Sequence, residues 1–568
     1  MRMRSPLATA VRCGALAAAN LILLGCDRPA GRAVEPAGPP IGAGPAAAVA
    51  AQTRARGGSL PALAVTSAQS IASGTTPFAT GCDGVAASGT LYPGAEVEPS
   101  FAIDPLDPAI MVGLWQQDRW SNGGSRGLVA AASRDGGKSW QRSFPPFSRC
   151  GGGSVVNGGN YERASDPWLS YSPNGVLHAM SLSISGSVNA MLASRSFDHG
   201  RTWTNATALI VDGAGAFNDK NAITADPADA HYVYAVWDRL NNSNSTGPTY
   251  FTRSTDGGAS WEAARPIYNP GLNQQTIGNQ IVVLPSGVLL DVADWIDASQ
   301  SARVVVLRSL DRGASWTGPV VVADLLSTGT RSPDTGAAVR DGSIIPEAAV
   351  APNGDVYVVW QDARFGTGAI DGIAISRSSD GGQTWSAPTR VNADPNVPAF
   401  TPSVHVTRDG VVGVLYNDFR SNTAAAPLST DVWLARSGNA GATWAEVRVN
   451  EAFDMTAAPV ANGLFVGDYQ GLLSANGRFV PFYARANVGD LDNRTDVVAA
   501  PLATTGAPPL PKTPAALRAE TQARRAMRVP RMDALRERSR ENVRNRMDYP
   551  PGFATGWLIP ESFRRLRR

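Results

Sequence analysis

Alternating apolar and polar positions recur along the chain in paired runs. In each pair, one run leads through a turn such as Pro-Asn-Gly or Asp-Gly into a second run that ends near an aromatic residue. Alternation with a period of two residues is typical of half-buried β-strands, and these turns join adjacent strands. The pairs, which we call strand-pair modules, span Glu98–Arg119, Asp166–Ser183, Lys220–Arg239, Gly278–Trp295, Ile345–Arg364, Thr401–Arg420 and Asp468–Arg485. The pattern therefore predicts seven such modules.

An eight-residue motif, Ser-x-Asp-x-Gly-x-Thr/Ser-Trp, follows each of the first six modules. Its copies are Ser133–Trp140, Ser196–Trp203, Ser254–Trp261, Ser309–Trp316, Ser378–Trp385 and Ser437–Trp444, the last with Asn439 in place of the Asp. The Asp can accept hydrogen bonds from the backbone N–H groups that follow it, and the Gly can adopt a positive φ, so each copy is predicted to turn the chain between two strands. Self-similarity at this spacing indicates a repeat architecture.

The motif resembles the Asp-box of the sialidase superfamily of β-propellers. The resemblance spans roughly Val97 to Leu502 and implies an all-β fold of radial, four-stranded blades without a long exposed edge. Seven modules favour seven blades; sialidases usually have six, so six blades plus an extra hairpin is the alternative. We expect all six Asp-boxes on one face. The 58 Gly and 41 Pro among 568 residues agree with a turn-rich β-protein.

The N-terminal segment has the features of an export signal. Arg2, Arg4 and Arg12 surround the start of an apolar stretch that ends in Leu-Leu-Gly-Cys at Cys26. This end resembles a bacterial lipobox, which implies lipidation of Cys26; an ordinary secretory signal cleaved near the same place is the alternative. We therefore expect an exported bacterial protein that is anchored to a membrane by its lipid and faces the periplasm or the cell surface, or one that is secreted.

Composition divides the chain into four parts. We expect a signal peptide at 1–26, a disordered linker rich in Ala, Gly and Pro at 27–76, a propeller at 77–511 and an Arg-rich tail at 512–568. The tail carries a net charge of +9, whereas residues 27–511 carry −10. The run from Pro514 to Asp548 is predicted to be helical, either lying on the acidic propeller or binding anionic lipid headgroups. We expect no binding of nucleic acid by an exported protein.

Cysteine and histidine usage limits the chemistry. Cys82 and Cys150 remain after export and lipidation, and an oxidising environment favours their pairing. No spacing resembles a zinc site, and we expect no metal and no cofactor. The four His residues fall in strand patterns or turns, which argues against a His-based catalytic triad.

Charged residues recur where the strand-pair modules begin and end. Because the Asp-box turns occupy one face of a propeller, the starts of first strands and the ends of second strands meet on the other face. The starts carry Glu98, Asp166, Asp219–Lys220, Glu347 and Asp468, and the ends carry Arg119, Arg239, Arg364 and Arg420. Such groups suit a sugar with a carboxylate or sulfate, with ion pairs between blades as the alternative. We expect a central cleft lined by these arginines, with Asp118 and Tyr469 at its floor.

The sialidase resemblance carries over to the site only in part. It implies that Asp118 is the acid/base and that Tyr469 is the nucleophile. Glu98-Pro99-Ser100 stands where a sialidase has Arg-Ile-Pro, so the first arginine of the carboxylate-binding triad is absent. Asn279 and Gln280 stand where the family has the glutamate that polarises the tyrosine.

Three functions are consistent with these residues. The first is a sialidase-like glycoside hydrolase with an altered site, acting on exported or surface carbohydrate that could include an anionic sugar. It needs two carboxylates, one with a raised pKa. The candidate carboxylates are Glu98, Asp118, Asp166, Glu347 and Asp468, and we expect Asp118, Tyr469 and Glu347 to be catalytic. The second is a non-catalytic propeller that binds a glycan or protein, and the third is a structural envelope lipoprotein. Acids that are all neutralised by arginine would favour the second and third.

Overall fold

The computed structural model describes residues 63–65, 69–84, 89–241, 245–504 and 531–547. Within these residues the regular structure is almost entirely β-strand, with one α-helix, α3 (Met532–Met547). The predicted all-β class is therefore confirmed. In the same part of the chain, no helix is long and apolar enough to cross a membrane.

The long strands pair antiparallel in consecutive groups. The first two groups are β3 (Leu91–Ile103), β4 (Met111–Trp120), β5 (Ser125–Ser133) and β6 (Gln141–Ser143), then β7 (Arg163–Tyr171), β8 (Leu177–Ser185), β9 (Val188–Ser196) and β10 (Thr207–Asp212). The next two are β11 (Ala216–Ala225), β12 (Val233–Asn241), β14 (Thr249–Ser254) and β15 (Arg265–Tyr268), then β16 (Gln274–Val283), β17 (Leu289–Ile296), β18 (Ala302–Ser309) and β19 (Thr317–Leu325). Short pairings between neighbouring groups merge them, through β5 and β7 and through β13 (Thr246–Gly247) and β16.

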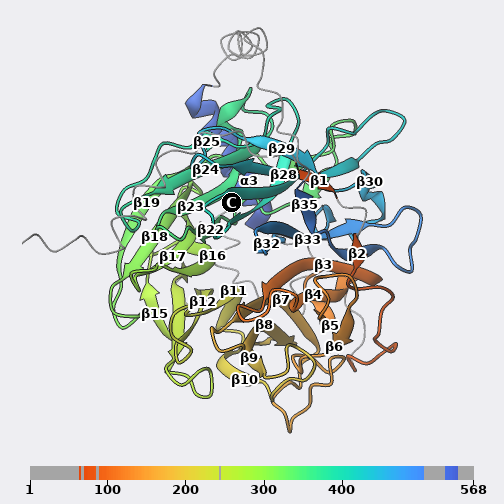
Figure 1. Cartoon of the computed structure of the whole chain (residues 1–568), viewed down its shortest axis with the longest axis vertical. Coiled ribbons are helices and arrows are strands. Elements are labelled where there is room, and N and C mark those ends of the chain that lie inside the picture. The colour runs from red at the N-terminus through yellow and green to blue at the C-terminus, as the bar shows by residue number, and fades with distance from the viewer. Residues whose placement is uncertain (1–62, 66–68, 85–88, 242–244, 505–530, 548–568) are drawn as a thin grey trace, which may run out of the picture. The chain divides into compact units, whose positions relative to one another are not determined.

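Three further groups follow along the chain. They are β22 (Glu347–Val350), β23 (Val356–Asp362), β24 (Gly372–Ser378) and β25 (Thr389–Arg390); β26 (Ala399–Val406), β27 (Val412–Asp418), β28 (Ser429–Ser437) and β29 (Ala445–Arg448); and β32 (Gly471–Ala475), β33 (Arg478–Ala486) and β34 (Thr495–Ala499). Short strands connect or flank them: β20 (Thr330–Arg331), β21 (Ala338–Arg340), β30 (Phe453–Asp454) and β31 (Leu464–Phe465). Figure 1 shows the groups following one another around a common centre, with β7, β11, β16, β22 and β32 nearest to it.

Strands from the two ends of the folded region pair with each other. β2 (Ser70–Ile71) adds to β34 as the outer strand of the last group, and β1 (Leu63–Val65) pairs with β35 (Leu502–Thr504). The expectation of a disordered linker through residue 76 is therefore wrong for this stretch. Its partners lie more than 400 residues away, so the small and polar composition of the linker gave no sign of the pairing.

The Asp-box turns are held by the hydrogen bonds that the motif predicts. In the first copy, Ser139 donates to both carboxylate oxygens of Asp135, through its backbone N–H (2.9 Å) and its hydroxyl (2.6 Å). The Ser133 hydroxyl donates to Asp135 and accepts from the N–H of Gly137. These donors hold the pKa of the Asp135 carboxyl below its usual range. In the sixth copy Asn439 accepts the same backbone bond, so the turn survives the substitution.

Neighbouring Asp-box turns lie side by side. An arginine at or before each turn donates to a backbone carbonyl of the next: Arg134 to Asp198, Arg195 to Gly257, Arg253 to Arg312 and Arg308 to Gly381. The first five copies therefore share one face, as expected. The first strands of the groups begin on the opposite face.

Cys82 and Cys150 form a disulfide, as predicted, with Cα atoms 5.0 Å apart. The bridge ties the segment before β3 to the loop after β6. A disulfide is typical of extracytoplasmic proteins. Lipidation of Cys26 lies outside the described residues.

Replacing both cysteines by serine is expected to lower the free energy of unfolding by about 4 kcal/mol. The bridge closes a loop with a sequence separation of 68 residues, and on the chain-entropy model a loop of that size restricts the unfolded chain by about this amount. Urea unfolding of the Cys82→Ser/Cys150→Ser variant measures the loss. Wild-type protein unfolded under reducing conditions should have the same free energy of unfolding as the variant. Equal stability of oxidised and reduced wild type would contradict the prediction.

Candidate functional site

A bulge recurs at the start of most first strands and turns one side chain toward the common centre. The strand register shifts within residues 97–100 of β3, 165–168 of β7, 219–222 of β11, 277–280 of β16 and 400–403 of β26. Glu98, Asp166 and Lys220 lie in these bulges with φ of 54°, 50° and 43°. A bulge re-aims a side chain, and a positive φ is costly for a residue other than Gly. The backbone thus accepts strain to direct three charged groups.

These side chains meet in what we call the axial cluster: Glu98, Asp166, Lys220, Arg340 and Asp468. The Lys220 ammonium lies 3.0 Å from Glu98 Oε1, 3.2 Å from Asp166 Oδ1 and 2.9 Å from Asp468 Oδ2. Arg340 Nη2 lies 2.6 Å from Asp468 Oδ2. The cluster therefore joins residues from the first, second, third and last strand groups and from β21.

The three carboxyl groups of the cluster differ in proton affinity. Burial raises the pKa of Glu98 to about 7, against the opposing effect of Lys220. Burial also raises the pKa of Asp166. For Asp468, burial is outweighed by Arg340 and Lys220, which hold its pKa below the usual value. One buried site thus contains a carboxyl group that is half protonated near neutral pH and a carboxylate that stays ionised.

Tyr469 and Arg119 lie beside the cluster. The Tyr469 hydroxyl donates to the carbonyl of Pro167 at 3.2 Å, and Lys220 lies 5.7 Å from the centre of its ring. Burial and the nearby carboxylates raise the pKa of Tyr469 above its usual value, so the phenol stays protonated. Arg119 donates to Gly124 O at 2.6 Å, and burial lowers its pKa to about 10.

Glu347 is buried near Tyr469 and starts β22. Burial raises its pKa to about 8, against a hydrogen bond with Ser403 that lowers it. Its charge is one of those that raise the pKa of Tyr469. Glu347 is therefore neutral at pH 7.

The other predicted arginines are held in ion pairs away from the axial cluster. Arg239 binds Asp212 through two hydrogen bonds of 2.6 and 2.7 Å. The alternative weighed from the sequence, ion pairs between blades, describes this pair, because Asp212 ends β10 of the preceding group. The remaining two are paired within their own groups: Arg364 binds Asp362, and Arg420 binds Asp418 and Glu446. The structure does not bring these three side chains to the axial cluster, because each has a nearer acidic partner.

Asp118 is also engaged elsewhere. Its side chain is fully buried and accepts from the Thr76 hydroxyl (2.8 Å), the N–H of Gly94 (2.9 Å) and Arg126 (3.3 Å). One oxygen therefore binds the segment before β3 together with β5, and the other binds β3 itself. This arrangement leaves Asp118 with a structural task rather than a place at the cluster.

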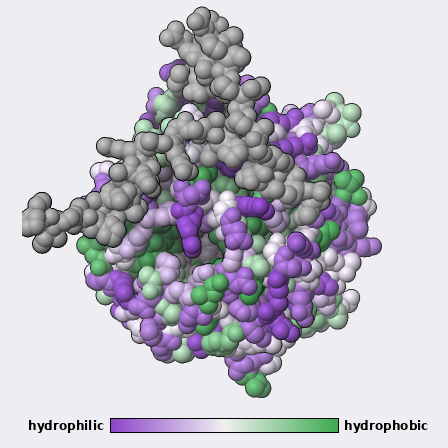
Figure 2. All heavy atoms as spheres, viewed as in Figure 1, coloured by the Kyte–Doolittle hydropathy of each residue, from purple (hydrophilic) through white to green (hydrophobic). Residues whose placement is uncertain are grey.

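A small hollow opens beside the axial cluster. Its volume is about 30 Å³, and it is lined by Lys220, Ile277, Arg340, Asp341, Ile344, Ile345, Asn462, Asp468 and Arg546. Figure 2 shows hydrophilic side chains gathered around a depression near the middle of the viewed face. Among the described residues, no group of three or more His, Cys, Asp or Glu is arranged to hold a metal ion.

Two residues of the hollow escaped the sequence analysis. Arg340 and Arg546 lie in β21 and α3, outside the repeated modules, so the repeat pattern carried no signal for them. Lys220 was noted as a strand start but not as a site residue. Its position, equivalent to Glu98 and Asp166 in the aligned modules, is the signal that could have identified it.

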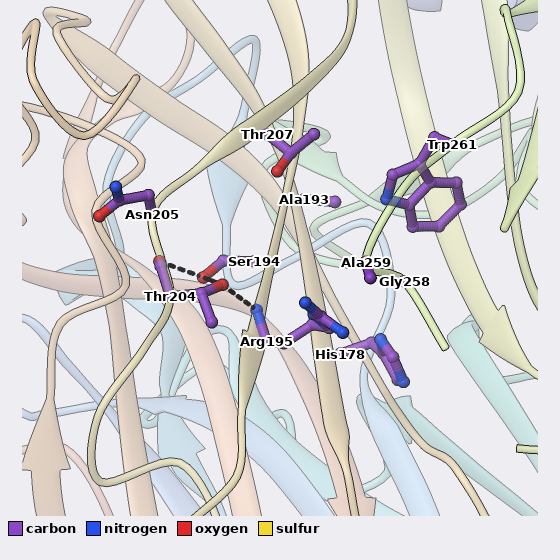
Figure 3. A pocket seen from close by; sticks show the side chains of 10 residues that line it. All are labelled: His178, Ala193, Ser194, Arg195, Thr204, Asn205, Thr207, Gly258, Ala259 and Trp261. Atoms are coloured by element: carbon purple, nitrogen blue, oxygen red, sulfur yellow. Dashed lines mark hydrogen bonds between the residues drawn. The ribbon is translucent and has the colours of Figure 1, made fainter. Parts of the chain in front are cut away.

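A larger cavity, of about 410 Å³, lies on the side of the Asp-box turns (Figure 3). It is lined by His178, Ala193, Ser194, Arg195, Thr204, Asn205, Thr207, Gly258, Ala259 and Trp261. Burial lowers the pKa of His178 to about 3, so its ring is neutral. The cavity contains none of the predicted site residues.

Comparison with known proteins agrees with the repeat pattern. A Paenibacillus xyloglucanase is 28% identical over 231 residues, which cover 38% of this chain and 21% of that protein, so the match spans about a fifth of its length. A Dyadobacter fermentans protein of unknown function (16% identical, 78% of this chain and all of that chain, TM-score 0.41) and a Hadza microbial sialidase (13%, 78% and 98%, TM-score 0.41) are similar solved structures. An α-L-arabinanase from Penicillium chrysogenum, complexed with arabinobiose, is 14% identical over 63% of this chain and 96% of its own (TM-score 0.38). Residues 220–454 match the family described as BNR repeat-like domain.

Proposed function

We propose that the protein is a retaining glycoside hydrolase that acts on exported or surface carbohydrate. The observation that carries the proposal is that two carboxyl groups, those of Glu98 and Asp468, contact the same ammonium group of Lys220. One carboxyl has its pKa raised to about 7 and the other has its pKa lowered. Two carboxyl groups with opposite shifts are the usual basis for separate acid and nucleophile roles.

The separation of the two groups supports retention of configuration. Glu98 Oε1 and Asp468 Oδ2 lie 3.0 and 2.9 Å from the same Lys220 nitrogen, so they are at most 5.9 Å apart. Retaining enzymes have carboxyl groups about 5–5.5 Å apart, and inverting enzymes about 6.5–9.5 Å. In the proposed reaction Glu98 gives its proton to the glycosidic oxygen while that bond breaks and Asp468 bonds to the anomeric carbon. Water, deprotonated by Glu98, then releases the sugar.

This assignment departs from the one that the sialidase resemblance implied. A tyrosine whose pKa is raised is a poor nucleophile, and Asp118 has protein donors on both oxygens. Tyr469 and Glu347 are therefore proposed to shape the site beside the reacting pair. Arg119 and Arg340 suit a substrate with a carboxylate or sulfate, because guanidinium groups bind such anions in a fixed geometry.

We further propose seven four-stranded blades between about Gly84 and Leu502, with β2 completing the last. An N-terminal strand as the fourth strand of the last group joins the two ends of the folded region and closes the ring of blades. Export with a lipid anchor at Cys26 is proposed on the lipobox resemblance alone. Contact of the basic tail with anionic lipid is proposed on the net charge of +9 in the tail.

A non-catalytic glycan- or protein-binding protein is the second candidate. It is favoured by one observation: Lys220 and Arg340 already neutralise the acids of the axial cluster. In that case the cluster would stabilise the centre of the molecule and the surface around it would bind the ligand.

A glycan array followed by proton NMR of the products separates the two candidates. The proposed function predicts cleavage of at least one bound glycan, with the product first appearing in the anomeric configuration of the substrate. Binding without cleavage would favour the second candidate. Inversion at the anomeric carbon would contradict the Glu98–Asp468 assignment.

A further inference from the structure

Helix α3 has one face that is built to dock. Leu535, Ser539, Asn542, Val543 and Arg546 follow the three- and four-residue spacing of a single helical face. The Leu535 and Val543 side chains have no exposed surface, although most of the helix is charged. Leu535 packs with Leu326 and Ala363, and Val543 joins the apolar cluster that contains Ile344 and Ile345. The helix therefore lies on the sheet groups. This is the first of the two alternatives given for the tail, a helix that lies on the acidic propeller.

Polar contacts fix the position of the same face. The Ser539 hydroxyl donates to Leu325 O at 3.0 Å, and the Asn542 amide donates to the Ser343 hydroxyl at 3.2 Å. Arg546 Nε donates to the Ser343 hydroxyl at 3.1 Å, and its Nη2 binds the carboxylate of Asp341, which is buried. A charge-assisted bond to a buried carboxylate is among the stronger contacts that a surface helix can make.

The docked helix ends at the axial cluster. It contacts residues 325–327, at the end of β19, and residues 341–345, just before β22. Both segments lie on the face where first strands begin. Arg546 lines the same hollow as Lys220, Arg340 and Asp468. Figure 1 places α3 close to β22 and β23.

The hollow is too small for a saccharide while α3 is docked. Its volume of about 30 Å³ has room for about two or three water molecules. Sites that enclose small molecules have volumes of about 300–1,000 Å³. A substrate that reaches Glu98 and Asp468 therefore requires a wall of the hollow to move. The other walls come from strands and from the loops that join them, whereas α3 is a helix that joins the body through its own docking face.

We propose that α3 is an autoinhibitory plug, which holds the axial cluster closed through Arg546 and must undock before substrate enters. This inference rests on the proposed function for the identity of the site that it closes. The charge asymmetry supports it, because the tail carries +9 and residues 27–511 carry −10. Part of the docking is a surface ion pair, Arg536 with Asp324 at 3.3 Å, so added salt should weaken it.

Full-length Arg546→Ala and Leu535→Asp test the plug, with Arg538→Ala as the matched control. Arg538 is an exposed arginine on the same helix, so its replacement removes the same charge outside the docking face. Hydrogen exchange of 532–547 and 341–345 reports docking without any substrate. Hydrolysis of 4-methylumbelliferyl sialoside, arabinofuranoside and glucoside reports access, and a glycan array reports binding.

The plug predicts faster hydrogen exchange in both test variants and a KM about tenfold lower at unchanged kcat, because a larger fraction of the protein is open. Arg538→Ala should match wild type. If no glycoside is cleaved but the test variants bind array glycans that wild type does not, the plug stands and the hydrolase proposal fails. If exchange increases while neither hydrolysis nor binding does, the plug is overturned. The plug would also be overturned if the helix amides exchanged as slowly in Leu535→Asp as in wild type, because docking would then not depend on the buried face.

Discussion

Replacement of Glu98 by Gln is expected to lower kcat/KM on a cleaved glycan by about 10²- to 10⁴-fold, the usual effect of losing a general acid. Gln keeps the size of the side chain and an oxygen that can accept from Lys220, which bonds to Glu98 Oε1. Its amide nitrogen stands where Glu98 Oε2 accepts from Gln116. It cannot give a proton to the leaving group. Steady-state hydrolysis with the substrate identified on the array measures the effect.

The pH profile gives this prediction a second readout. The pKa of Glu98 is about 7, so wild-type activity should fall as pH rises through that value and the acid loses its proton. The profile of Glu98→Gln should lack this limb. Asp212→Asn is the control, because it removes a carboxylate that is bound to Arg239 away from the cluster. Equal activity of Glu98→Gln and wild type would show that Glu98 is not the acid.

Replacement of Lys220 by Met is expected to lower the free energy of unfolding by about 3–5 kcal/mol at pH 8, because it leaves three buried carboxyl groups without their shared cation. The Lys220 side chain is 10% exposed and contacts Glu98, Asp166 and Asp468 within 3.2 Å. Its pKa is raised well above the usual value. Its stabilising charge is therefore fully present at neutral pH and is lost only when the pH rises through the folded-state pKa.

The loss should be smaller at pH 5 than at pH 8. Without the ammonium, Glu98 and Asp166, whose pKa values burial already raises, take up protons at pH 5 and stop repelling each other. Urea unfolding at both pH values measures the difference. Lys138→Met is the control, because Lys138 is an exposed residue in the first Asp-box turn. A loss that is equal at both pH values would mean that Lys220 acts through packing and not through its charge.

Much of the local structure could be predicted from the sequence. The Asp-box turns form as expected because their hydrogen bonds join residues at most four positions apart, such as Asp135 and Ser139. The strand-pair modules were visible because alternation has the same period as the β-strand. The disulfide followed from the small number of cysteines, and α3 from the composition of the tail.

The site was predicted less well, for a geometric reason. The repeat indicates on which face a residue lies, but not its distance from the centre or its nearest partner. Arg239, Arg364 and Arg420 are on predicted positions, yet each binds a local acid. Arg340 was not found, because it lies in an insertion without a repeat.

The sequence by itself thus determined the strand pattern, the turns, the disulfide and the set of charged strand starts, because each depends on neighbouring residues or on composition. The tertiary structure alone decided which charges share Lys220 and which segment covers them. Lys220 and Asp468 are 248 positions apart, and Arg546 and Asp341 are 205 apart. Contacts of that kind depend on how the strand groups close around the centre and on the bulges that aim each side chain, and neither leaves a local pattern in the chain.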